Sequence, residues 1–349
     1  MLFRSGAAVV VFTLVVGLLE MAEMLRRTAE MPVTFSTILA LTAMKTPLTL
    51  QTLFPFIGLF AGVMTFWRLT RSSELTVIRG SGVSVWQFML PVLFIAALIG
   101  GIKVAAIGPM ASSLYASYLQ RMTELNDKGV RLFNVSDGSL WMLQSDPDTN
   151  SFIHAPFGWQ DAGELKQSIM FFFDKKEKFI RRIDAAKARL EPGHWTLTDA
   201  WITGPDQPPR FERAMEIPTE LTADRMQESF APPETISFWE LSNFIDQLDR
   251  AGFSSTRHRL VWHRQLVEPL LMFAMVMIGA TYSLRLTRRG GTLYLVFAAV
   301  LTGLLLHFAT TASVAFGRSE AIPIVLAAWT PALMTTLLGI SLLLHLEDG

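Results

Sequence analysis

Six apolar runs constrain this chain more than any other feature of its sequence. They cover residues 6–19, 46–67, 85–108, 266–284, 292–314 and 322–344. An apolar helix of about 20 residues is long enough to cross the hydrocarbon core of a bilayer. Charged residues make up 17% of the 349 residues, whereas soluble domains carry about 25%. The sequence therefore predicts an α-helical membrane protein with six transmembrane helices, although the first run is short for a full span.

Two basic loops indicate the orientation of these spans. The turn 67–82 carries three arginines against one glutamate, and the loop that follows residue 284 carries three arginines and no acid. Because Lys and Arg are enriched in cytoplasmic loops, we expect both loops and both chain termini in the cytoplasm. The layout is then three spans, an outer domain and three further spans.

The region 126–233 differs in composition, because it has no apolar run long enough to span a membrane. Short segments of β character recur in it, separated by turn residues such as Asp137-Gly138. The segments are Val130–Val135, Ser139–Leu143, Ser151–Phe157, Ser168–Phe173, Lys178–Ile183, His194–Ile202 and Arg210–Ile217. Strands at about ten-residue spacing with turn signals are typical of a β-sandwich or jelly roll. We therefore expect an all-β jelly-roll domain on the outer side of the membrane.

These patterns divide the chain into three parts. Residues 1–125 would hold the first three transmembrane helices with a cytoplasmic helix, and residues 126–233 the β-domain. Residues 234–349 would hold an amphipathic helix and the last three transmembrane helices. The amphipathic helix is expected after Ser237 and before Gly252, because apolar residues recur there at helical spacing.

The turn between the second and third runs has the pattern of a short helix. Leu75 and Ile78 are at helical spacing, Ser73 can cap the start, and Gly80 and Gly82 can end it. The segment would lie along the inner membrane surface and be presented to a cytoplasmic partner. The alternative is a solvated hairpin that only connects two spans.

Several kinds of chemistry are excluded by the sequence. There is no cysteine, so disulfides and thiolate nucleophiles cannot occur. No nucleotide-binding P-loop, dinucleotide fingerprint or nucleophile elbow is found. His258 and His263 are five residues apart, whereas a helical zinc pair is four apart. We expect no catalytic residue, metal or cofactor, and the net charge of zero gives no global field for nucleic acid.

Several short motifs stand out along the chain: Leu53-Phe54-Pro55, Arg71-Ser72-Ser73-Glu74-Leu75 through Gly82, Gly108-Pro109, Gly193-His194-Trp195-Thr196-Leu197, and Ile236-Ser237 through Gly252. Together they resemble the LptF/LptG (YjgP/YjgQ) family of lipopolysaccharide-export permeases. The resemblance covers nearly the whole chain. Its motif in the β-region and the helix after it lean toward the LptG-like member of the pair.

The resemblance implies a non-enzymatic permease subunit of an ABC exporter in the bacterial inner membrane, with its β-domain in the periplasm. The resemblance implies that such a subunit pairs with a homologous LptF-like subunit and binds a cytoplasmic LptB-like ATPase dimer. The complex would pass lipopolysaccharide to LptC/LptA-like bridge proteins. The turn after the second span would be the coupling helix that contacts the ATPase. Its candidate residues are Arg71, Glu74, Leu75, Ile78, Arg79 and Gly82.

The resemblance implies basic residues near the outer interface as contacts for substrate phosphates, and the candidates are Arg26, Arg27, Lys45 and Arg121. Glu20 and Glu23 lie where the family tends to carry basic residues, and they complete the set of candidate substrate contacts. Glu20 and Glu23 share one helix face, which is either a polar stripe lining a lipid cavity or a water-exposed end. For the basic residues the alternative is snorkelling to the interface. At the level of function, the alternative is a membrane-anchored periplasmic sensor or scaffold whose β-domain binds a ligand.

Overall fold

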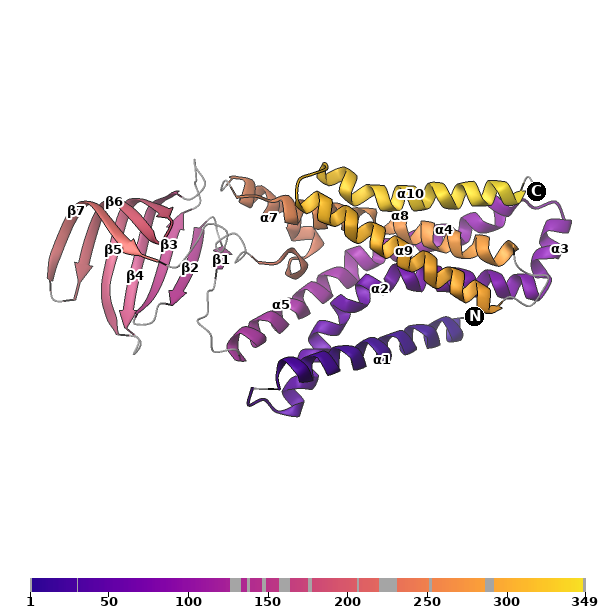
Figure 1. Cartoon of the computed structure of the whole chain (residues 1–349), viewed down its shortest axis with the longest axis horizontal. Helices are drawn as coiled ribbons and strands as arrows, with labels where there is room; N and C mark the ends of the chain where they lie inside the picture. Colours follow the sequence, from indigo (N-terminus) through magenta and orange to yellow (C-terminus); the bar gives the residue numbers. More distant parts are fainter. Residues whose placement is uncertain are drawn as a thin grey trace. The chain divides into compact units, whose positions relative to one another are not determined.

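The structure of the chain is a computed structural model. It describes residues 2–29, 31–125, 133–136, 139–145, 149–156, 164–174, 178–205, 207–219, 231–250, 253–285 and 292–347. The chain divides into two units (Figure 1). The helical unit comprises Met1–Tyr118, Ser237–Trp239 and Thr256–Gly349, and the sheet unit comprises Leu119–Ile236 and Glu240–Ser255.

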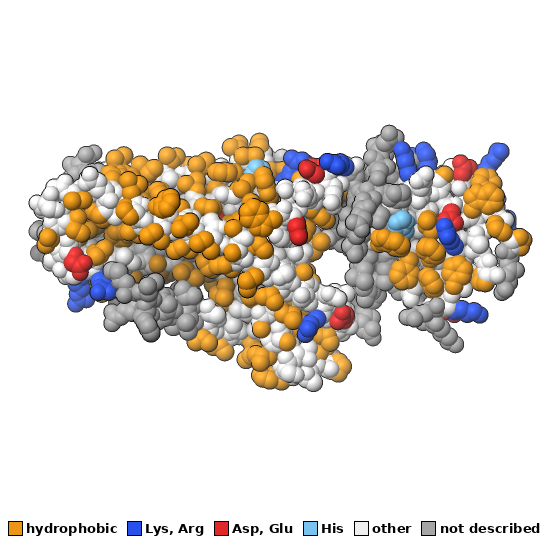
Figure 2. Space-filling model, turned by 180° about the vertical axis from the view of Figure 1, so that it is seen from behind, with side chains coloured by type: hydrophobic (Ala, Val, Ile, Leu, Met, Phe, Trp, Pro, Cys, Tyr) orange, Lys and Arg blue, Asp and Glu red, His pale blue; other side chains and the backbone are white. Residues whose placement is uncertain are grey.

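The helical unit is built from long helices. They are α1 (Leu2–Arg27), α2 (Phe35–Arg71), α4 (Val85–Ile102), α5 (Gly108–Leu125, shared with the other unit), α8 (Thr256–Arg285), α9 (Thr292–Arg318) and α10 (Ile324–Glu347). Figure 2 shows that hydrophobic side chains cover most of the visible face of this unit. Such a surface suits lipid contact, because apolar side chains there need no water.

Among the described residues, five helices are long and apolar enough to cross a membrane. They are Phe35–Arg71, Val85–Leu125, Thr256–Leu284, Val296–Arg318 and Ile324–His345. The helix α1 is not among them, and its apolar part before Glu20 is short for a full span. The chain is thus a helical membrane protein, while the expected count of six spans is not confirmed.

Polar caps define where two of these helices begin, and α2 thereby starts well before its apolar run at residue 46. The α2 helix begins after Thr34, whose hydroxyl accepts a hydrogen bond from the Thr37 amide. The α4 helix begins after Ser84, which forms a reciprocal capping box with Gln87. The apolar runs mark the membrane-facing lengths, whereas the caps set the helix ends.

The helices α2 and α8 pack closely in the helical unit. A Cβ atom on Gly62 would lie 2.8 Å from the carbonyl oxygen of Val276, and one on Gly279 would lie 2.5 Å from that of Leu59. The two backbones therefore touch, as small residues allow between membrane helices. The serine hydroxyl of Ser283 adds a hydrogen bond of 2.8 Å to the Val63 carbonyl.

The sheet unit contains one antiparallel sheet whose strands follow the order of the sequence. Its strands are β1 (Phe133–Ser136), β2 (Ser139–Ser145), β3 (Thr149–Pro156), β4 (Glu164–Asp174), β5 (Phe179–Glu191), β6 (His194–Gly204) and β7 (Gln207–Pro218). All seven expected strand segments overlap these strands. The Greek-key crossover of a jelly roll is absent from the described strands, because each one pairs with its neighbour in sequence. The inserted β-region is confirmed, and the jelly roll is not.

One face of the sheet forms the core of this unit. Buried Met142, Ile153 and Ile183 lie on it and pack with Leu248 of the amphipathic helix α7 (Phe238–Arg250). Strand side chains alternate between the two faces, and Trp201 on the other face is exposed. The expected amphipathic helix is therefore present, and its apolar side covers the sheet.

Candidate functional site

The first candidate site is the short helix α3 (Glu74–Gly80), where the sequence predicted a helix. A sharp turn separates it from α2, with Ser73 in the left-handed region at a φ of 60°. The Ser72 hydroxyl lies between Arg68 O and Glu74 Oε1, at 3.0 and 2.8 Å. After the helix, Gly82 has a φ of 83°, a conformation that glycine adopts at little cost. The turn residues thus fix where α3 begins and ends.

The side chains of α3 divide into an anchoring side and an exposed side. Leu75 is buried and holds the helix against its own unit, whereas Val77 is 73% exposed. Glu74 is also exposed, and the guanidinium of Arg71 lies 5.3 Å from the centroid of the Trp67 ring. Ile78 is half-buried. Figure 1 shows α3 at the end of the helical unit where the C-terminus lies.

The predicted coupling residues therefore lie on α3 and at the turns that flank it. The side chain of Arg79 falls outside the described residues. Val77 was not among the predicted contacts, although it is the most exposed apolar side chain of the turn. The sequence pattern of Leu75 and Ile78 revealed the buried side of the helix, and the exposed side follows from it by rotation about the axis.

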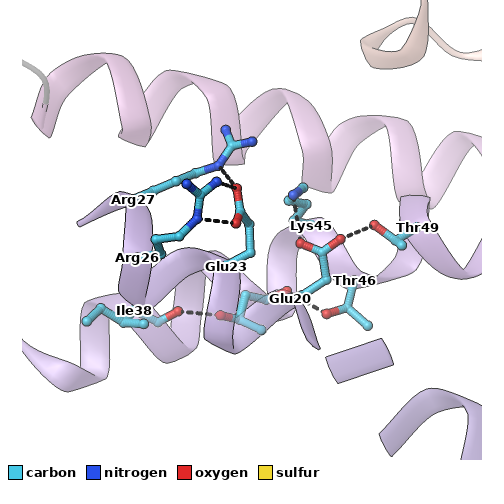
Figure 3. A network of polar contacts seen from close by, with 9 residues as sticks. Glu20, Glu23, Arg26, Arg27, Ile38, Lys45, Thr46 and Thr49 are labelled. Atoms are coloured by element: carbon cyan, nitrogen blue, oxygen red, sulfur yellow. Dashed lines mark hydrogen bonds and ion pairs between the residues drawn. The ribbon is translucent and has the colours of Figure 1, made fainter. Parts of the chain in front are cut away.

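The second candidate site joins α1 to α2 (Figure 3). Lys45 Nζ of α2 lies 2.7 Å from Glu20 Oε2 of α1, and the Thr49 hydroxyl donates to Glu20 Oε1 at 2.7 Å. Both charged side chains are largely buried, so the carboxylate exchanges its water for two protein partners. The sequence analysis named Glu20 and Lys45 as charged candidates, but it did not predict that they form an ion pair between α1 and α2.

A second carboxylate lies one turn further along α1. Glu23 accepts hydrogen bonds from Arg26 Nε at 2.9 Å and from Arg27 Nε at 2.7 Å. These bonds lower the pKa of Glu23 to about 2 and raise the pKa of Arg26. The pKa of Arg27 is raised mainly by its bond to Glu23, and Tyr118 of α5 contributes as a neighbour.

Five of the six predicted substrate contacts thus gather where α1 packs on α2. We refer to Glu20, Glu23, Arg26, Arg27 and Lys45 as the α1–α2 charge cluster. Three cations against two carboxylates leave it with one net positive charge. The sixth, Arg121, is exposed on α5 and belongs to the sheet unit, so it is described apart from the cluster.

Sequence reasoning missed a third polar feature. Lys103, within the third apolar run, is 6% exposed and forms an ion pair with Glu268 of α8. It opens a π-helical turn, η1 (Lys103–Ile107), that joins α4 to α5. Two signals were available in the sequence: a lysine inside the third apolar run, and a glutamate followed by proline near the start of the fourth. Intramembrane charges of this kind require a partner, but the sequence does not show which one.

The family model described as "Lipopolysaccharide export system permease LptF/LptG" matches residues 1–345. The chain is 22% identical to the lipopolysaccharide export system permease protein LptG of Escherichia coli (strain K12) over 250 residues, which cover 69% of this chain and 67% of that protein. It is 21% identical to the protein of the same name from Haemophilus influenzae (strain ATCC 51907 / DSM 11121 / KW20 / Rd) over 283 residues, 76% of this chain and 73% of that one.

Proposed function

This chain belongs to the lipopolysaccharide export system permease LptF/LptG family, and we propose that it is the membrane-spanning subunit of an ABC exporter in the bacterial inner membrane. The family match over residues 1–345 supports this proposal most strongly. The five apolar helices supply the membrane part, and ATP would be hydrolysed by a separate cytoplasmic subunit. The chain itself would convert closure of that subunit into rearrangement of a lipid path.

The proposed docking element is α3. A short helix between two membrane helices can transmit force only if it is held firmly on its own side and exposed on the other. Leu75 provides the first contact, and Glu74 with Val77 provides the second. An apolar knob beside a carboxylate fits a groove that offers an apolar floor and a basic rim.

The proposed contact for the lipopolysaccharide head group is the α1–α2 charge cluster. Figure 1 shows that the end of α1 that carries it is remote from α3 within the helical unit. Arg26 is mostly exposed, with 77% of its side chain accessible, and guanidinium groups bind phosphates in a bidentate manner. The carboxylates would keep the cations in place until a phosphate competes for them. The apolar faces of α1, α2 and α9 would suit the acyl chains.

The remaining partners follow from the same proposal. A homologous LptF-like subunit would complete the lipid cavity, and the sheet unit would lie in the periplasm. There it would pass lipopolysaccharide to LptC/LptA-like bridge proteins. A periplasmic sensor or scaffold is the alternative, since the sheet also exposes Trp141 and Trp201 to possible ligands.

The two functions make different predictions for a single experiment. The chain is co-expressed with candidate ATPase and permease partners, purified, and reconstituted with lipopolysaccharide. Glu74→Lys should abolish co-purification of the ATPase or uncouple hydrolysis from lipid release. Glu240→Lys, the same reversal on the exposed side of α7, is the matched control and should behave as wild type. Normal lipid release by the Glu74→Lys chain would refute the coupling role, and hydrolysis insensitive to lipopolysaccharide would favour the scaffold.

A further inference from the structure

A buried ion pair coincides with an irregular helix turn in the helical unit. Lys103 is the first residue of η1, and its ammonium group pairs with the carboxylate of Glu268. The same ammonium lies 5.4 Å from the centroid of the Phe54 ring on α2. Charges inside membrane-spanning segments are costly and mark functional positions more often than structural ones.

The backbone of the π turn is stabilised by side chains from two other segments. Gln51 of α2 donates to the Ile107 carbonyl at 3.3 Å, and the indole of Trp239 donates to the Ala105 carbonyl at 3.1 Å. A π turn interrupts the regular hydrogen-bond ladder, so its carbonyls gain from outside donors. The irregular turn is therefore supported on several sides.

The facing helix is irregular at the same level. Pro269 lies inside α8 directly after Glu268. It has no backbone N–H, so the helix lacks one of its hydrogen bonds there. A Cβ atom on Gly100 would lie 2.8 Å from the Cα of Pro269, so α4 and α8 touch by their backbones at this point. Two weakened turns thus face one another, and the Lys103–Glu268 pair bridges them.

We propose that η1 is a hinge between α4 and the first turns of α5, and that the Lys103–Glu268 ion pair is its latch. With the pair formed, α5 is fixed in one direction relative to α4. When the pair opens, the segment after Ile107 can change direction without unfolding either helix. The role of this motion in transport rests on the proposed function, whereas the hinge itself does not.

The absence of cysteine makes the hinge directly measurable. Phe94 on α4 and Met110 on α5 are 70% and 66% exposed and lie on either side of η1. They are sixteen positions apart in sequence, which corresponds to about 24 Å along a helix axis. Spin labels on the Phe94→Cys/Met110→Cys chain in lipid nanodiscs would report the distribution of distances across the hinge. The melting temperature of each variant would be recorded beside it.

Three latch variants separate a latch from a structural contact. Lys103→Met should broaden the distance distribution and lower the melting temperature, because it leaves Glu268 buried without its partner. Lys103→Met/Glu268→Met should restore the melting temperature but keep the broad distribution. The charge swap Lys103→Glu/Glu268→Lys is the matched control and should restore the narrow distribution, since the ion pair is kept.

Each outcome decides the question. A double-methionine chain with the wild-type distribution overturns the latch, because shape alone would then fix the turn. A charge swap that stays broad despite a wild-type melting temperature overturns it too. If reconstituted wild type releases no lipopolysaccharide while the variants broaden as described, the proposed function fails and the hinge stands.

Discussion

Lys45 Nζ lies 2.7 Å from Glu20 Oε2, so an ion pair between side chains that are 19% and 11% exposed joins α1 to α2. The Thr49 hydroxyl completes the coordination of the same carboxylate. Pairs this far from water gain from their mutual attraction but lose heavily if one partner is removed. The association of α1 with its neighbour therefore depends on both charges.

Removal of one charge from this pair should destabilise the helical unit. Glu20→Gln leaves the Lys45 ammonium without a counter-ion, and we expect a loss of about 2 kcal/mol in the free energy of unfolding. Glu20→Met/Lys45→Met should cost less, because no unpaired charge remains. Denaturant titrations in a defined detergent would compare the two, and a double variant that loses more than the single one would contradict this account.

Acid should weaken the other half of the charge cluster. The pKa of Glu23 is lowered from 4.5 to about 2, chiefly by its hydrogen bond from Arg26 and then by that from Arg27. Its ion pairs therefore contribute stability fully above pH 4.5 and lose that contribution as the pH falls toward about 2. The effect is small because the group is solvent-exposed. Melting temperatures of wild type and Glu23→Gln should converge over this interval, and a difference independent of pH would refute the assignment.

The two sides of α3 should respond differently to substitution. Val77→Ser removes an exposed apolar side chain and should weaken binding of the proposed ATPase partner about tenfold, which corresponds to about 1.4 kcal/mol, without changing the melting temperature. Leu75→Ala removes a buried one and should cost about 2–3 kcal/mol of stability. Binding isotherms and melting curves measured on the same samples would test the pair. Equal loss of ATPase binding and stability in both variants would show that α3 has no separate docking side.

Close packing of α2 on α8 should make Gly62 sensitive to one methyl group. Gly62→Ala would place its Cβ 2.8 Å from a backbone oxygen, so the helices must separate, at about 1–3 kcal/mol. Gly58→Ala is the matched control, because its nearest neighbour is the flexible end of Met272 at 3.1 Å. Thermal melting of both variants in nanodiscs measures the difference, and equal melting temperatures would contradict it.

The sequence predicted the features that depend on local pattern. The apolar runs located five membrane helices, and alternation with turn residues located all seven strands. The short helix α3 was predicted because Leu75 and Ile78 repeat between capping serines and glycines. In each case the signal and the structure arise from the same few consecutive residues.

Features that depend on distant partners could not be predicted in this way. Lys103 and Glu268 are 165 residues apart, and neither residue indicates the other. The π turn after Lys103 follows no periodicity of its own, since Val104, Ala105 and Ala106 suit any helix. The sheet topology could not be predicted for a similar reason, because strand spacing does not distinguish a meander from a jelly roll.

The backbone contact between α2 and α8 limits which parts of the membrane domain can separate. At Gly62 and Gly279 the backbones of α2 and α8 touch, so sliding of one helix along the other would cause a steric clash. We therefore expect α2 and α8 to move together as one rigid body. In the apolar stretch of α8, 61% of the residues are buried, whereas only 11% are buried in that of α9. Relative motion in the membrane domain is then expected around the α2–α8 pair, for example at α9, where a Cβ atom on Gly303 would have only side-chain atoms of α2 as its nearest neighbours.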